Sequence, residues 1–483
     1  MSSNIQIQKL KEILLIAIAT VIFLLLLSRD SYLYLCGPRV DSAWFFMCGK
    51  AWMNGMVPYV DFADSKGPLL WLIYGVGYLF SPHNYYGIFW IGCLFYTFTF
   101  YFIYRTLLIF IPNKFQAFAG TFLVGVVFFN SVTHSEIRAE DFSLPFIALC
   151  IWQMCEIAFE KDYLRQNVFK FFFLFGISFS CTFLMKYSIT IFVCFFLLIS
   201  VFYLIREKAD FLKALGGGLL GAGVIIIPFL VYLILQGNLQ AFINEYFTNT
   251  LATISNLGGP LSVIDTFAWR FSCLLTNKPL VIIELCIAVS SIAVSKKLHT
   301  ALPAVLFFLF FLITVYIGTF TYYYAVTAIM SVWLVLSLHY FLEKKRFATY
   351  FISAIAITGV VFLFAYNLRQ PETIFNKHTA EELNKIESIY QKYDKPKVTC
   401  VMVERGFGIT AEALPASKYW TRQNGITEEM DRVNIAGIRS SDVVAMEEKG
   451  FSNPEIREQL SKSGFGNIEI VSLAGTTYYI FTK

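Results

Sequence analysis

Residues 41 to 82 read DSAWFFMCGKAWMNGMVPYVDFADSKGPLLWLIYGVGYLFSP, and the fold of the whole chain depends on how this stretch is placed. It carries acids and lysines up to residue 66 and is apolar from 68 to 82. A helix that crosses the hydrocarbon core of a membrane needs roughly 20 apolar residues. The apolar part has only about fifteen and is interrupted by glycines, so whether it crosses decides on which side every later loop lies.

The composition places the chain in a membrane. Of its 483 residues, 57% are hydrophobic and only 15% are charged, whereas a typical soluble protein has about 25% charged residues. The formal net charge of +5 is small and unevenly placed. It is typical of the basic cytoplasmic loops of a membrane protein, so membrane lipids are expected around the chain and no nucleic-acid partner is expected.

Eleven apolar runs have a suitable length for membrane spans. They lie near 11 to 28, 86 to 111, 115 to 132, 142 to 160, 168 to 185, 187 to 205, 214 to 235, 279 to 294, 300 to 318, 322 to 342 and 348 to 366. If segment 68 to 82 does not cross, every basic turn between these runs falls on the cytoplasmic side, as membrane proteins prefer. We therefore predict a surface-lying or re-entrant helix there, and a twelve-span arrangement is the alternative.

Four polar stretches are then expected outside the cytoplasm: residues 29 to 67, 133 to 141, 236 to 278 and everything after about 367. From Gln370 onward the composition becomes ordinary, with an amphipathic stretch at 380 to 393. Short β-like runs follow at 398 to 403, 442 to 446, 468 to 472 and 476 to 482. The prediction is an all-α polytopic bundle over 1 to 367, with its first outer loop at 29 to 67, and a small extracytoplasmic α/β domain over 368 to 483.

The first outer loop carries residues that can do chemistry. Asp41 opens a helical stretch, and Asp61, Asp64 and Lys66 follow before the Gly-Pro that begins the next helix. Carboxylates beside a lysine at a membrane surface can activate a hydroxyl and hold a phosphate. The alternative is a solvated loop whose acids cap helices.

The pattern of this loop resembles a known family. An acid leading an aromatic helix, then Gly-x-x-Pro-Tyr-x-Asp, then Asp-x-Lys-Gly-Pro-Leu-Leu is similar to the first outer loop of the GT-C membrane glycosyltransferases. The nearest branch looks like the family 39 type, the bacterial relatives of protein O-mannosyltransferases and the lipid A aminoarabinose transferase. The resemblance implies that Asp41 activates the acceptor, that Lys66 lies next to the carrier phosphate and that Asp64 is the acid beside it.

Two later segments extend the resemblance. HSEIRAEDFSLPF, residues 134 to 146, places Arg138, Glu140 and Asp141 where the family has a second polar cluster. Charged residues at the end of a span can also be interfacial anchors. FLMKYSIT places Lys186 between two apolar runs; the family often has a lysine here that helps to neutralise the phosphate, and the alternative is a snorkelling side chain.

The chain departs from the family near the predicted tenth span. Many members have a His-Tyr pair there, whereas FTYYYAVTAI offers Tyr322 and Tyr323, which the alternative interpretation assigns to an aromatic belt. Three other charged residues are weaker candidates: Glu284, Arg270 and Lys278. The spacing shows no nucleotide loop and no metal-ligand cluster, although some members of the family use a divalent cation, which Asp41 and the nearby acids would bind.

The resemblance implies a glycosyltransferase at the outer face of the cytoplasmic membrane. A polyprenyl-phosphate-linked monosaccharide would be the donor, and a glycan, lipid or protein of the envelope the acceptor. For this function Asp41 must lie close to Lys66, Arg138 and Lys186. The alternatives are a transporter that uses Lys186 and Glu284 along its path and a non-catalytic membrane partner.

Overall fold

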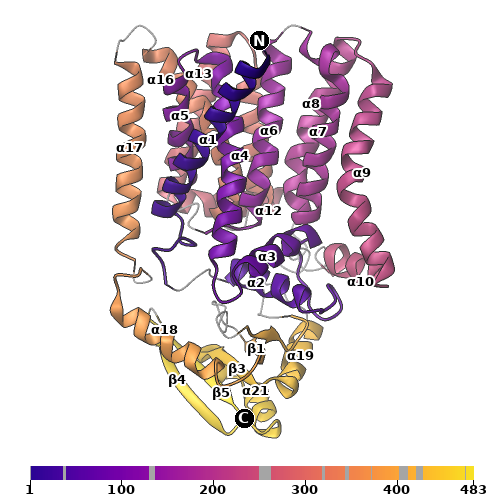
Figure 1. The fold of residues 1–483 in the computed structure, drawn as a ribbon, viewed down its shortest axis with the longest axis vertical. Coiled ribbons are helices and arrows are strands. Elements are labelled where there is room, and N and C mark those ends of the chain that lie inside the picture. Colours follow the sequence, from indigo (N-terminus) through magenta and orange to yellow (C-terminus); the bar gives the residue numbers. More distant parts are fainter. Residues whose placement is uncertain are drawn as a thin grey trace.

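A computed structural model describes residues 2–35, 40–129, 136–160, 162–249, 263–317, 321–342, 347–370, 373–401, 412–419, 428–473 and 475–483. It is a bundle of long helices with a small sheet domain at one end (Figure 1). The N-terminus lies at the opposite end of the bundle. We call the end of the bundle that faces the sheet domain the domain face.

The bundle consists of the predicted apolar runs. Its helices are α1 (Ser2–Leu27), α4 (Tyr86–Phe110), α5 (Lys114–Phe128), α6 (Ala139–Phe159), α7 (Tyr163–Met185), α8 (Tyr187–Arg206), α9 (Phe211–Leu235), α13 (Lys278–Leu298), α14 (Leu302–Ile317), α15 (Tyr324–Ala328), η3 (Ile329–Ser331), α16 (Val332–Leu342) and α17 (Ala348–Asn367). In the described ranges, nine helical segments are long and apolar enough to cross a membrane, with α15, η3 and α16 counted as one, and α5 and α14 are shorter. Each of the eleven predicted runs coincides with one of these segments, which confirms the polytopic bundle.

Segment 68 to 82 forms a helix that does not run with the bundle. This helix, α3 (Pro68–Phe80), and the preceding α2 (Val40–Met53) lie across the domain face (Figure 1). The two helices touch at Gly49, where a Cβ atom would come within 2.4 Å of the Gly75 backbone nitrogen. Their course across the end of the bundle supports the surface-lying placement over the twelve-span arrangement.

Further short elements cover the domain face beside α2 and α3. They are α10 (Leu239–Ile243), the π-helical turn η1 (Asn244–Asn249), α12 (Val263–Thr276) and the turn η2 (Thr321–Tyr323). One continuous apolar core includes side chains of α2, α3 and η1 together with side chains of the sheet domain, among them Trp71, Tyr246 and Val398. The sheet domain is therefore packed onto the domain face.

The sheet domain follows α17. Its elements are α18 (Lys377–Tyr390), β1 (Lys397–Val401), β2 (Leu414–Pro415), α19 (Glu428–Gly437), η4 (Ile438–Ser440), β3 (Val443–Glu447), α20 (Glu448–Phe451), α21 (Pro454–Lys462), β4 (Asn467–Leu473) and β5 (Thr476–Thr482). The strand order is β2-β1-β3-β5-β4, with β1 parallel to both its neighbours and β5 antiparallel to β3 and β4. The predicted β-like runs coincide with β1, β3, β4 and β5, and the short β2 was not predicted.

Candidate functional site

The segment between α2 and α3, residues 57–67, forms a compact loop that we call the strap. It turns at Tyr59, a non-glycine residue with a φ of 67°, whose backbone nitrogen donates to the Phe62 oxygen over 2.7 Å. The buried Tyr59 hydroxyl donates to the Lys66 carbonyl over 3.0 Å. Asp61 is exposed and its carboxylate accepts from the Val57 nitrogen over 2.6 Å. The structure thus gives Asp61 a turn-capping contact, and its role in substrate binding stays a prediction.

A break between α7 and α8 brings the two predicted lysines together. Lys186 is the single extended residue between these helices, with a φ of −158°. The nitrogen of Gly67, next to Lys66, donates over 3.0 Å to the Met185 oxygen at the end of α7. A Cβ atom on Gly67 would lie 2.1 Å from the Leu184 oxygen, so this approach requires glycine.

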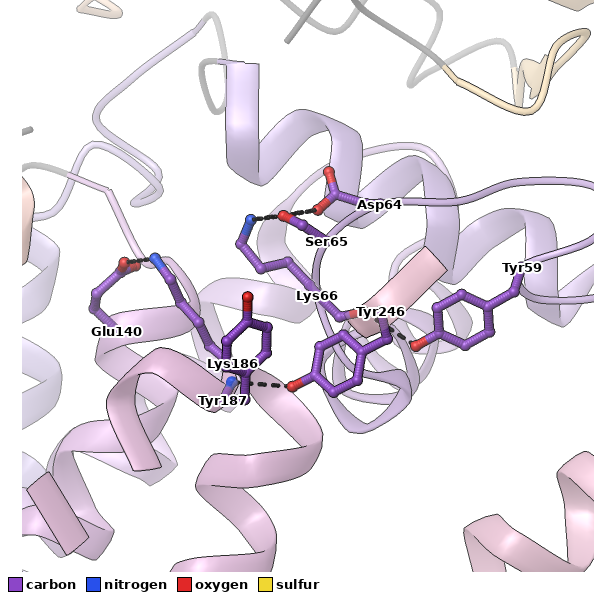
Figure 2. A network of polar contacts seen from close by, with 8 residues as sticks. All are labelled: Tyr59, Asp64, Ser65, Lys66, Glu140, Lys186, Tyr187 and Tyr246. Carbon is purple, nitrogen blue, oxygen red and sulfur yellow. Dashed lines mark hydrogen bonds and ion pairs between the residues drawn. The ribbon is translucent and has the colours of Figure 1, made fainter. Parts of the chain in front are cut away.

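Tyr246 of η1 stabilises the helix break. Its hydroxyl accepts from the Tyr187 nitrogen over 3.0 Å (Figure 2). The same hydroxyl donates to the Phe183 oxygen. The break leaves backbone donors and acceptors without intrahelical partners, and a buried one would cost free energy. One fully buried phenol therefore satisfies both ends of the break and fixes the backbone on either side of Lys186.

Each lysine is paired with a buried acid, Lys66 with one from the strap itself and Lys186 with one from α6 (Figure 2). Lys186 forms an ion pair with Glu140 in the first turn of α6. The Lys66 Nζ lies 3.3 Å from the Asp64 carboxylate and 3.0 Å from the Ser65 hydroxyl. Because Lys186 is only 7% exposed and paired, the snorkelling interpretation does not fit it.

The electrostatics keep the strap lysine charged. Burial lowers the pKa of Lys66, but the carboxylates of Asp64 and Asp41 outweigh it and leave the pKa above its ordinary value. The ammonium groups of Lys66 and Lys186 repel each other across the site. Two neighbouring ammonium groups on fixed backbone offer hydrogen-bond donors for the oxygens of one phosphate group.

Aromatic and basic side chains from the later part of the chain complete the surroundings. The Lys186 Nζ lies 4.1 Å from the ring centre of Tyr323, a favourable cation–π geometry. Arg270 of α12 is half-buried near Tyr323 and Tyr316, and its Nε has no hydrogen-bond partner among the described residues. The side chain of Tyr322 lies outside what the structure describes.

Asp41 is a third acid close to the lysine pair. It lies in the first turn of α2 and is half-buried, and its charge raises the pKa of Lys66, so the two side chains are neighbours. No hydrogen bond or ion pair joins its carboxylate to a described residue. A carboxylate with free lone pairs can accept a proton from a bound hydroxyl.

The acids and the arginine at the start of α6 have different surroundings. Asp141 accepts hydrogen bonds from the Tyr96 hydroxyl and, over 2.8 Å, from the Arg138 nitrogen, so it caps α6. Arg138 lies 3.4 Å from the Glu136 carboxylate and its charge acts on Glu140. The structure thus places Arg138 at the edge of the lysine pair, and substrate contacts of Arg138 and Asp141 stay predictions.

The remaining candidates lie apart from the lysine pair or are untested. Glu284 is buried in α13 near Tyr324, and neither carboxylate oxygen has a hydrogen-bond partner within the described ranges. Lys278 is the first residue of α13. The described residues contain no group of three or more His, Cys, Asp or Glu side chains that could hold a metal, so a bound divalent cation stays a prediction.

Sequence reasoning missed the residues that hold the site together. Tyr59, Gly67 and Tyr246 fix the lysines through backbone contacts. The signal for Gly67 was present, because the Lys-Gly-Pro sequence marks a close approach at a helix start. Nothing in the local sequence connects Tyr246 with a helix break some sixty residues earlier.

The fold is that of a known membrane transferase. The chain resembles the crystal structure of ArnT from Cupriavidus metallidurans bound to undecaprenyl phosphate, with a TM-score of 0.65 and 11% identity over 98% of each chain. The apo state of the same protein gives a TM-score of 0.53, also with 11% identity over 98% of each chain. ArnT is the lipid A aminoarabinose transferase and has a GT-C fold, so the predicted GT-C likeness is confirmed at the level of the fold. No protein-family model and no curated protein matches the sequence.

Proposed function

We propose that this chain is a GT-C glycosyltransferase that moves a monosaccharide from a polyprenyl-phosphate carrier to an acceptor hydroxyl. The observation that carries the proposal is the meeting of Lys66, Lys186 and Asp41 at one end of the helical bundle. Among the described residues the Asp41 carboxylate has no hydrogen-bond or ion-pair partner. The likeness to a fold that binds undecaprenyl phosphate in ArnT supports it. A lipid carrier keeps its phosphate at the membrane surface, and the end of the bundle that holds these residues would lie there.

Each residue has a part in an inverting transfer. The donor phosphate would lie against Lys66 and Lys186, with Arg270 as a third cation. Asp41 takes the proton of the acceptor hydroxyl while the oxygen attacks the anomeric carbon. The bond from that carbon to the phosphate oxygen breaks, and the released polyprenyl phosphate keeps the electron pair. Cations already fixed at the phosphate stabilise the charge that develops there.

The charge distribution supports an outer location for the domain face. Lys114, Arg206 and Lys296 lie at helix ends remote from that face, at the end of the bundle where α4, α8 and α13 finish. Cytoplasmic loops are enriched in Lys and Arg. The sheet domain and the site would therefore lie outside the cytoplasm, on a multi-pass protein of the cell membrane.

Two measurements separate donor binding from transfer. Detergent-purified protein is tested for undecaprenyl phosphate binding, and membranes containing it are tested for transfer from a panel of labelled polyprenyl-phosphate monosaccharides. Asp41→Asn should keep binding and lose transfer, because it removes the proton acceptor and leaves both lysines. Asp394→Asn, on an exposed acid of the sheet domain, is the matched control. Normal transfer by Asp41→Asn would remove this residue from the mechanism.

A further inference from the structure

The sheet domain reaches the site through one short segment that follows β2. The Ala63 nitrogen of the strap donates over 2.8 Å to the Lys418 carbonyl. Ala63 immediately precedes Asp64, the acid that pairs with Lys66. The sheet domain thus contributes a backbone hydrogen bond to the loop that carries one of the two lysines.

The same segment also holds the element that braces the other lysine. Glu245 of η1 is buried, and its Oε1 accepts from the Tyr419 hydroxyl over 2.9 Å and forms an ion pair with Lys418. Its Oε2 accepts from the Asn249 side chain over 2.9 Å. The next residue, Tyr246, is the one whose hydroxyl bridges the break at Lys186. We call Glu245, Lys418 and Tyr419 the latch.

We infer that the latch is a positioning device for the active site, through which the sheet domain sets the spacing of Lys66 and Lys186. Lys418 connects to the strap through its carbonyl and to η1 through its ammonium group. Glu245 is buried and Lys418 is partly exposed. Losing their ion pair removes a contact that holds η1 to the segment bound to the strap, so a change at Glu245 would reach both lysines. This inference rests on the proposed function, since the spacing matters only if both lysines hold one phosphate.

Other contacts join the two parts of the molecule without touching the strap or η1. The Lys395 Nζ lies 3.1 Å from the Asn54 side chain at the end of α2, and the Tyr78 hydroxyl lies 3.4 Å from the Glu412 carboxylate. If these contacts only attached the sheet domain to the bundle, losing one of them would have the same effect on substrate affinity as losing the latch. Lys395→Met is therefore the matched control for Lys418→Met.

The test is the effect of Glu245→Gln and Lys418→Met on substrate affinity. We expect the donor KM and the undecaprenyl phosphate Kd to rise about tenfold, as for the loss of one charge-assisted hydrogen bond, with kcat nearly unchanged. A variant that merely unfolds in part would lose kcat and keep its KM. The double variant E245Q/K418Q replaces the ion pair by two amides that can hydrogen-bond, and it should recover most of the affinity.

The outcomes separate the latch from the proposed function. If the wild type is active and Glu245→Gln keeps the KM of the wild type and of Lys395→Met, the latch is wrong and the function stands. If the wild type neither binds undecaprenyl phosphate nor transfers sugar, the function is wrong. Hydrogen exchange of the strap amides then decides whether a latch exists, because Glu245→Gln should expose the Ala63 amide and Lys395→Met should not.

Discussion

Two lysines of the α2–strap region, one partly exposed and one buried, differ in what surrounds them. Lys66 has Asp64 and Ser65 within hydrogen-bond reach and a raised pKa. Lys50 of α2 is fully buried, its Nζ has no hydrogen-bond partner in the described part of the chain, and burial lowers its pKa to about 7 despite Glu387 and Glu412. A buried ammonium group therefore stays a reliable cation only where the fold supplies a carboxylate, as it does at the proposed phosphate site.

The largest expected effect comes from removing Lys66, whose raised pKa keeps it charged. Lys66→Met should weaken undecaprenyl phosphate binding roughly 100-fold, because charge-assisted hydrogen bonds to a phosphate are lost. Lys50→Met, in the same α2–strap region, should leave this binding unchanged. Isothermal titration of both proteins in detergent checks the contrast. Equal losses of affinity in the two variants would mean that the whole α2–strap region had been disturbed. The different surroundings of Lys66 and Lys50 would then not explain phosphate binding.

The next largest effect is expected at Gly67, whose close approach to the end of α7 positions Lys66. Gly67→Ala forces a Cβ atom to within 2.1 Å of the Leu184 oxygen, so the strap must move away from the break at Lys186. We expect a loss of stability of about 1–3 kcal/mol and a clear loss of phosphate binding. Thermal unfolding and titration measure the two. Gly216→Ala is the control, because a Cβ there meets no atom within 4 Å.

The elements that could be predicted are those specified by neighbouring residues. Apolar runs of span length predict helices wherever they occur, and the strap's acids and lysine were identified because they are adjacent in sequence. The pairing of Lys186 with Glu140 joins residues 46 positions apart and depends on how α6 and α7 pack. The latch joins residues more than 170 positions apart, and no local pattern marks it. Asp141 was identified as a polar residue, but its contacts with Tyr96 and Arg138 are those of a helix cap.

Stability measured over a pH series tests the lowered pKa of Lys50. Below pH 7 Lys50 is protonated both folded and unfolded, and the folded state carries the cost of burying the charge. Between about pH 7 and its ordinary value of 10.5 the folded state has released a proton that the unfolded state keeps, so stability rises with pH. The rise is about 1.4 kcal/mol per pH unit.

Lys50→Met should remove this slope and be more stable than the wild type at pH 7. Thermal midpoints of both detergent-solubilised proteins at several pH values check the prediction. Groups that titrate in both proteins cancel in the difference. Parallel curves for the two proteins would show that Lys50 is solvated and not buried as a charge.

The smallest expected effect concerns the phenol that braces Lys186. Tyr246→Phe keeps the ring in its aromatic surroundings and removes only the hydroxyl that joins the Tyr187 nitrogen to the Phe183 oxygen. Two partly buried backbone groups then lose a partner, which costs about 1–3 kcal/mol. Because Lys186 keeps its ion pair with Glu140, phosphate affinity should fall only severalfold, far less than in Lys66→Met.

Tyr232→Phe on α9 is the control for loss of a phenol, because Tyr232 makes no such contact with Phe183, with Tyr187 or with the α7–α8 break. A drop as large as that of Lys66→Met would mean that the backbone at the break, more than the two side-chain charges, determines phosphate binding.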